Sequence, residues 1–142
     1  MPDPTPAMFS LEVEGLSLGS FPRVSGIGSE TEVIEFKQTG PDGRMIIRKV
    51  PGATKWSEIV LERRMDVSRV LWDWRQQVID GDVDLARRDG AVVAYDASGL
   101  EVARWSFTGG WPSKITGVDV DEAREEPGTE RVTIVHEGLV RG

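Results

Sequence analysis

The chain has 142 residues, a formal net charge of -7 and a pI near 4.8. Its length fits a single domain, residues 1–142, built around one core. Such an acidic balance disfavours attraction to phosphate backbones or anionic lipid. The absence of cysteine excludes disulfides and thiolate metal sites.

The first residues carry neither a basic region nor an apolar one, and no stretch approaches 18 apolar residues. We therefore expect a soluble protein of the cytoplasm that has no contact with a membrane. Three prolines among the first six residues predict an extended, flexible leader over residues 1–7.

Alternation of apolar and polar residues predicts short antiparallel strands along most of the chain. The expected strands cover residues 9–14, 16–24, 32–37, 45–50, 58–63, 91–95, 101–107, 115–120 and 131–136. The turn cluster Thr39–Gly43 joins two of them into a hairpin with a polar tip. Gly109-Gly110 is predicted to be a turn that ends the strand over 101–107.

One helix is predicted after the strand over 58–63, with Asp66 as its N-cap and Gly81 as its end. Its apolar stripe has helical spacing and consists of Val67, Val70, Leu71, Trp74 and Val78. The sequence therefore predicts a mainly β protein, a small antiparallel β-barrel or β-sandwich with one flanking α-helix.

Catalytic and metal motifs are incomplete. Gly15–Gly19 matches G-x-S-x-G and His136 lies downstream, but Ser17 falls between two strand patterns, whereas a nucleophile elbow needs a strand-to-helix turn. His136, the single histidine, is expected to have a hydrogen-bonded structural role. Asp80, Asp82 and Asp84 imitate the start of an EF-hand loop that lacks its glycine and final glutamate. We expect no catalytic residue, no bound metal and no cofactor.

Trp72 falls outside the predicted apolar stripe of the helix, which makes it a candidate for a contact beyond the subunit's own core. The acidic residues of the segment before the last strand are interpreted as a solvated rim. They are Asp119, Asp121, Glu122, Glu125 and Glu126.

Four blocks of the sequence are familiar: "GLSLGSFPRVSGIGSETEVIEF", "KVPGATKWSEIVLERRMDVSRVLWDWRQQVIDG", "RRDGAVVAYDASGLEVARWSFTGGWPSKITG" and "RVTIVHEGLVR". Together they resemble the tail tube protein family of contractile phage tails and phage-tail-like contractile injection systems. The matching positions include Pro51-Gly52 with Lys55, Asp73-Trp74, Arg104-Trp105, Trp111–Lys114 and His136–Gly138.

The resemblance implies a tail-tube fold, shared with the Hcp protein of type VI secretion, and a structural role without enzymatic activity. It implies that six copies form a ring whose sheets join into an inner β-barrel, and that rings stack into a hollow tube inside a contractile sheath. The implied partners are further copies of the chain, the sheath protein, baseplate and hub proteins, and a luminal cargo, effector protein or DNA, that passes without tight binding. The particle would assemble in the cytoplasm.

Within this hypothesis, the hairpin over 32–50 is expected to reach an adjacent subunit, so that deleting residues 39–43 would abolish rings or stacking. The candidates for subunit contacts are Thr39, Gly40, Pro41, Asp42, Gly43, Trp72, Trp105, Trp111, Pro112 and Lys114. The candidates for sheath contacts are Arg63, Arg64, Arg87 and Arg88.

The acidic composition predicts a lumen in which Asp and Glu outnumber Lys and Arg, because such a wall repels acidic cargo. A monomeric β-barrel with a small ligand between Trp105 and Trp111 is the competing interpretation. A hydrolase that uses Ser17 and His136 is a third.

Overall fold

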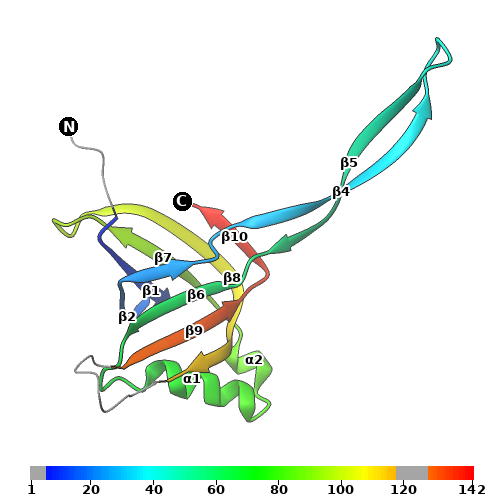
Figure 1. Cartoon of the computed structure of the whole chain (residues 1–142). Helices are drawn as coiled ribbons and strands as arrows, with labels where there is room; N and C mark the ends of the chain where they lie inside the picture. Colours follow the sequence, from blue (N-terminus) through cyan, green and yellow to red (C-terminus); the bar gives the residue numbers. More distant parts are fainter. Residues whose placement is uncertain (1–5, 118–127) are drawn as a thin grey trace.

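The computed structural model describes residues 6–117 and 128–142 of the chain (Figure 1). Two helices, α1 (Val70–Ile79) and α2 (Val83–Ala86), accompany the strands. The strands are β1 (Met8–Val13), β2 (Leu16–Phe21), β3 (Arg23–Ser25), β4 (Ser29–Thr39), β5 (Met45–Trp56), β6 (Ile59–Arg64), β7 (Arg88–Tyr95), β8 (Glu101–Thr116), β9 (Thr129–Val135) and β10 (Gly138–Arg141). The predicted mainly β, antiparallel fold is confirmed.

Eight strands form one bent antiparallel sheet in the order β2-β1-β7-β8-β9-β6-β3, with β10 also beside β8. Residues 101–110 of β8 pair with β7, and residues 111–116 pair with β9. We call β2, β1, β7, β10 and the first part of β8 the first half-sheet. The second half-sheet consists of the rest of β8 with β9, β6 and β3. No ladder joins β2 to β3, so the sheet is not a closed barrel.

The core lies between the two half-sheets and is filled by side chains. The first half-sheet contributes Leu11, Val92 and Phe107, and the second contributes Leu61 and Ile134, all at most 1 % exposed. The helices lie together at one end of the body (Figure 1), where the buried side chains of Leu71 and Trp74 join the same cluster. A packed interior leaves the ligand-binding barrel interpretation without support.

The helix begins later than the sequence predicts. Asp66 accepts a hydrogen bond from the backbone N–H of Ser68 at 2.8 Å, so it forms a local turn ahead of α1 and does not cap the helix. Val67 is fully exposed and outside the apolar stripe, whereas Leu71 and Trp74 are buried as expected. The indole of Trp74 donates to the carbonyl oxygen of Ala86 at 2.6 Å, which ties α1 to the unpredicted α2.

The predicted turn at Gly109-Gly110 is wrong, because β8 continues through both glycines to Thr116. A side chain at Gly110 would overlap the ring of Phe107, so the missing Cβ makes room for a core aromatic. Pro112, also inside β8, is buried opposite Ile134 next to a bulge. The glycines and proline mark the bend between the half-sheets.

Only the end of the predicted leader lies within the described residues. Residues 1–5 lie outside the described residues, and the backbone N–H of Ala7 donates to the carbonyl oxygen of Tyr95 at 2.8 Å. The predicted strand over 115–120 is described only as far as Thr116 in β8, and the expected acidic rim also lies outside the described residues.

Gly26 is essential where the chain leaves β3 for β4. Its φ is +81°, and a Cβ there would overlap the carbonyl oxygen of Glu58. Gly43 has a similar φ of +78° but open space around it. Both alanine variants incur the cost of left-handed backbone, about 1–2 kcal/mol. In urea denaturation we expect Gly26→Ala to lose clearly more stability than Gly43→Ala, whereas equal losses would contradict a steric requirement at Gly26.

Candidate functional site

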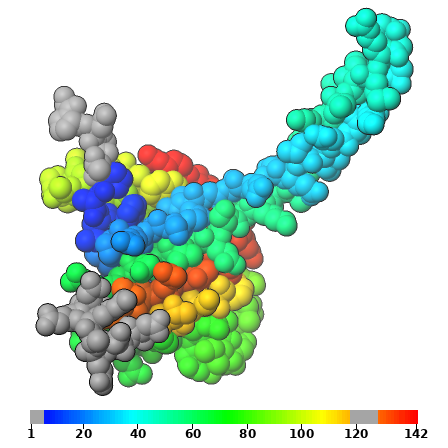
Figure 2. All heavy atoms as spheres, viewed as in Figure 1, coloured from blue at the N-terminus to red at the C-terminus, as the bar shows by residue number. Residues whose placement is uncertain are grey.

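A two-stranded arm, β4 and β5, projects from the body far beyond the rest of the molecule (Figures 1 and 2). The strands are longer than the sequence predicts and pair from Ser29 opposite Trp56 to Thr39 opposite Met45, with one shift of register between Thr31 and Val33. Pro51 is tolerated within β5 because each strand of a two-stranded ribbon has one edge without a partner, and a proline there leaves no hydrogen bond of the ladder unmade. Every residue of β4 is exposed in the subunit.

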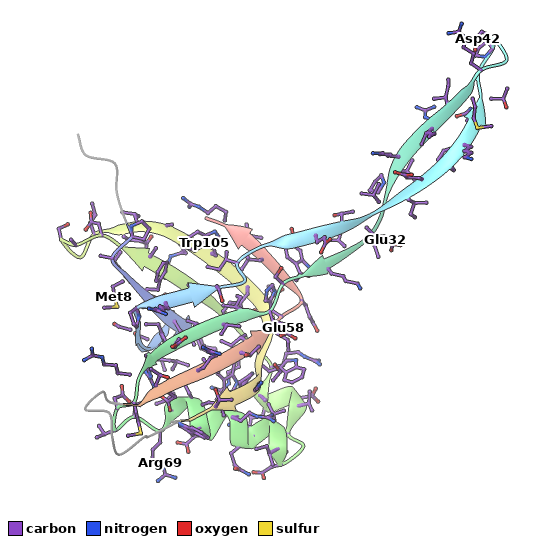
Figure 3. The ribbon with its side chains drawn as sticks, in the orientation of Figure 1. Met8, Glu32, Asp42, Glu58, Arg69 and Trp105 are labelled. Atoms are coloured by element: carbon purple, nitrogen blue, oxygen red, sulfur yellow. The ribbon has the colours of Figure 1, made fainter. Side chains whose placement is uncertain are left out.

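The tip of the arm is a tight turn at the predicted cluster (Figure 3). The N–H of Gly43 donates to the carbonyl oxygen of Gly40 at 3.0 Å, and the N–H of Arg44 donates to the Asp42 carboxylate at 3.1 Å. Pro41 occupies the second turn position, where its fixed φ fits, and Gly43 takes the positive φ. The local sequence therefore fixes the shape of the tip.

The two faces of the arm differ in chemistry. Residues directly opposite in an antiparallel pair share a face. One face carries Ile34, Phe36, Ile46 and Val50, which are between 36 % and 48 % exposed, together with Arg48 and Gln38. We call its four apolar residues the apolar arm face. The opposite face mixes apolar residues with an ion pair between Glu35 and Lys49 at 3.7 Å.

An isolated hairpin of this length is marginally stable in water. Its strands pair only with each other among the described residues, and exposed apolar side chains on a ribbon edge favour association. The arm is therefore built to be covered by another surface.

The base of the arm is held by an aromatic contact. The ring of His136 lies between Trp56 at the end of β5 and Phe107 of the core, with ring centroids 5.9 Å and 6.1 Å apart. Neither ring nitrogen of His136 has a hydrogen-bond partner among the described residues. The structural role expected for His136 therefore includes aromatic packing, which the sequence did not suggest.

Burial lowers the pKa of His136, and the nearby backbone of Ser57 and Gly138 offsets only part of this effect. Since the unfolded chain then binds a proton more readily than the folded one, stability decreases as the pH falls through about 6.5. We expect His136→Phe to flatten this dependence, because it keeps an aromatic ring and removes the chain's single histidine. Urea denaturation at several pH values measures the slope, and an unchanged slope in the variant would contradict the assignment.

Among the predicted contact residues, four of the five at the tip are exposed and Gly40 is half-buried, while Lys114 is exposed. Trp72 is 41 % exposed, and its indole Nε1 donates to the Glu130 carboxylate. Trp105 packs against the core under the guanidinium of Arg141, 5.5 Å from the ring centroid. The structure therefore spreads these residues over several surfaces instead of gathering them into one site.

Two further predicted contact residues are at least partly inside the subunit. Pro112 is buried in its core, where it is unavailable to a neighbour, whereas Trp111 is half-buried. Because β8 runs on where a turn was expected, Pro112 points inward opposite Ile134.

The four arginines expected to meet a sheath are not equivalent. Arg63 is 4 % exposed and pairs with the buried Glu130 at 3.1 Å, so it has no surface to offer a sheath. Arg88 donates to Gln77 at 3.0 Å and to the carbonyl oxygen of Leu85 at 3.2 Å. Arg64 is exposed, and Arg87 is partly exposed beside Glu137.

Arg63 is a residue whose role sequence reasoning missed. Ile59, Leu61 and Arg63 alternate along β6, and the first two point into the core. The same period-two pattern places Arg63 on the inward face. The signal was present in the sequence, although the charge of Arg63 suggested the surface.

The residues of the catalytic and metal motifs do not come together into a site within the described part of the chain. Ser17 is an exposed residue of β2, and its hydroxyl accepts a local hydrogen bond from the N–H of Gly19 at 3.4 Å. No three acidic or histidine side chains converge as a metal site within residues 6–117 and 128–142. In that same part of the chain, no helix has the length and apolar character needed to span a bilayer.

Comparison with protein-family models matches the T4-like virus tail tube protein gp19 over residues 5–140, nearly the whole chain. The chain belongs to this tail tube family. The resemblance that the four sequence blocks carry is thereby confirmed. A comparison with curated protein sequences finds no match.

Solved structures share the fold of this tail tube family member. The PVC sheath-tube complex of an extracellular contractile injection system in the extended state matches with a TM-score of 0.77 and 18 % identity, covering 100 % of this chain and 93 % of that chain. The tube terminating cap of the anti-feeding prophage gives 0.76 and 17 %, covering 100 % and 91 %. Hcp1 from Flavobacterium johnsoniae gives 0.57 and 22 %, covering 95 % and 94 %.

Proposed function

We propose that the chain is the inner-tube subunit of a contractile injection system or contractile phage tail. In this role hexameric rings stack into a hollow conduit for cargo or DNA, inside a sheath and on a baseplate. The observation that carries the proposal is the arm, which exposes an apolar face on a ribbon that pairs with nothing else among the described residues. Family membership supports it.

The second half-sheet supplies the means to close a ring. Among the described residues, neither β3 at one edge nor the second part of β8 at the other has a further strand beside it. Two edges that lack a strand partner allow one copy to continue the ladder of the next, head to tail, until a rotation closes the ring. Helix α1 lies against β8, where Arg75 donates to the carbonyl oxygen of Pro112 at 3.5 Å. Contacts between rings do not close, so stacking gives a tube of open length.

Two of the solved neighbours are described as a sheath-tube complex and as a six-fold symmetrised baseplate. These descriptions support sheath and baseplate proteins as partners of this chain. Of the four arginines expected to contact a sheath, Arg64 and Arg87 are exposed. Assembly in the cytoplasm would precede incorporation into the particle.

Light scattering on the purified protein after size exclusion separates the proposal from a monomeric ligand-binding protein. The proposed role predicts a mass six times the 15.7 kDa of one chain, or larger stacks. A stable 15.7 kDa species at every concentration would contradict it.

A further inference from the structure

The outward face of the second half-sheet carries several cations. One rung across its strands is Arg23, Glu62, Arg131 and Thr116, and the next is Ser25, Val60, Thr133 and Lys114. Arg64 lies opposite Thr129 on the same face. We call the outward side chains of these ten residues the basic wall.

The basic wall is positive on an acidic protein. It carries four cations, Arg23, Arg64, Lys114 and Arg131, and one anion, Glu62, for a net charge of +3, whereas the whole chain carries -7. Glu62 is already engaged with Arg131 at 3.0 Å. The other three cations make no ion pair within residues 6–117 and 128–142.

The wall also lacks the side chains that make a surface adhere. None of its ten residues is among the exposed large hydrophobic side chains, which occur on the arm, on and before the helices, and on the first half-sheet. Examples on those other surfaces are Ile47, Leu85 and Val140, each at least 59 % exposed. Surfaces that become subunit contacts are apolar at their centres. By this criterion the basic wall is the face that stays in water after assembly.

Geometry gives the wall its place in a ring. If β3 and β8 continue the sheet into neighbouring copies, the opposite face of the half-sheet is covered by the subunit's own core. Because the core and the helices need more room than the wall, they lie on the outer side of the closed cylinder. The basic wall then faces the interior of the cylinder.

We propose that the basic wall lines the conduit and that the cargo it fits is an acidic polypeptide. The inference rests on the proposed ring-and-tube assembly and specifies its lumen. It replaces the acidic lumen expected from composition, and it moves Arg64 from a sheath contact to the lumen.

A polypeptide fits this wall better than a nucleic acid. Serine and threonine separate the cations, and none of the ten wall residues is aromatic. The next rung pairs Trp111 with Val135, and both are only half-buried, so this tryptophan at the margin of the wall is a ring on which bases could stack. A duplex would neutralise many cations in every ring and be retained strongly through release of its counterions. An acidic polypeptide, with its sparser charge, is attracted and still released at physiological ionic strength.

Single-cysteine variants of this cysteine-free chain locate the wall. In assembled tubes, Thr116→Cys should react with a small maleimide and not with a protein-sized one, whereas dissociated subunits should react with both. Ser98→Cys, in the turn between β7 and β8, is the control that should react with both reagents in tubes. Reaction of Thr116→Cys with the protein-sized reagent in tubes would overturn the inference but leave the proposed function standing. Absence of tubes would overturn both.

The cargo class is tested by sedimenting tubes with fluorescent poly-glutamate. At low salt we expect the tubes to retain poly-glutamate. In the double variant Arg23→Gln with Arg131→Gln, this retention should decrease by up to about fivefold for each charge removed. Arg69→Gln, which removes one charge from an exposed residue before α1, is compared with each single wall variant and should leave retention unchanged. Poly-lysine retained in place of poly-glutamate would contradict the proposal.

Two other occupants are distinguished by the same assay. DNA retained at physiological salt, where the peptide is released, would assign the wall to nucleic acid. Greater peptide retention after five carboxylates are replaced by their amides would assign the wall to the chain's own acidic segment. These carboxylates are Asp119, Asp121, Glu122, Glu125 and Glu126. Either result would overturn the acidic-cargo assignment.

Discussion

Replacing Phe36 and Ile46 by aspartate should leave a folded subunit that no longer assembles. Both side chains belong to the apolar arm face and are 44 % and 48 % exposed in the isolated subunit. Covering an apolar side chain of this size contributes about 1.5–3 kcal/mol when burial is complete. Two buried carboxylates would add a desolvation cost. We therefore expect the concentration required for tubes to increase by at least about tenfold.

The control for this variant places the same charges on the other face of the arm. Val33 and Ile47 are more exposed, at 61 % and 60 %, and lie among charged neighbours. Sedimentation compares both variants, and circular dichroism verifies that the body stays folded. Normal tubes from the Phe36 and Ile46 variant, or equal losses in the two variants, would contradict a specific role of the apolar arm face.

Removing the guanidinium of Arg63 should be among the most destabilising single changes in the body. Its Nε donates to Glu130 at 3.1 Å, one terminal nitrogen donates to the carbonyl oxygen of Leu18 at 3.3 Å, and its charge lies 4.9 Å from the ring centre of Phe21. Arg63→Ala leaves the buried Glu130 without its cation, a change that typically costs about 3–5 kcal/mol.

The neighbouring rung supplies a matched control. Arg63 lies opposite Glu130 on the inward face of β6 and β9, and Glu62 lies opposite Arg131 on the outward face of the same two strands. The outward pair is partly exposed, with Arg131 at 57 %. Arg131→Ala should therefore cost less than about 1 kcal/mol. Urea denaturation measures the free energy of unfolding of both variants. Similar losses of stability would show that burial does not determine how much the inward pair stabilises the fold.

Alternation identified most strands of the body and the hairpin that becomes the arm, because side chains with one buried face follow a period of two. The arm was underestimated in length. Val33 to Phe36 indicates a strand by its apolar residues, but Glu30 to Glu32 and Pro51 to Lys55 do not, since neither face of the ribbon is buried in the subunit's own core at its base.

Other features depended on contacts distant in the sequence. Gly110 resembles a turn residue until Phe107 is placed beside it, and Asp66 resembles a helix cap until Ser68 takes its hydrogen bond. The charge of the basic wall could not be predicted from a total of -7, because only the register between β3, β6, β9 and β8 places its cations on one face.

Electron microscopy of the purified protein tests the central claim most directly. The proposed role predicts six-fold rings in end views and hollow tubes of stacked rings in side views, without any added ligand. Well-dispersed single subunits at high protein concentration, or solid filaments without a lumen, would contradict it.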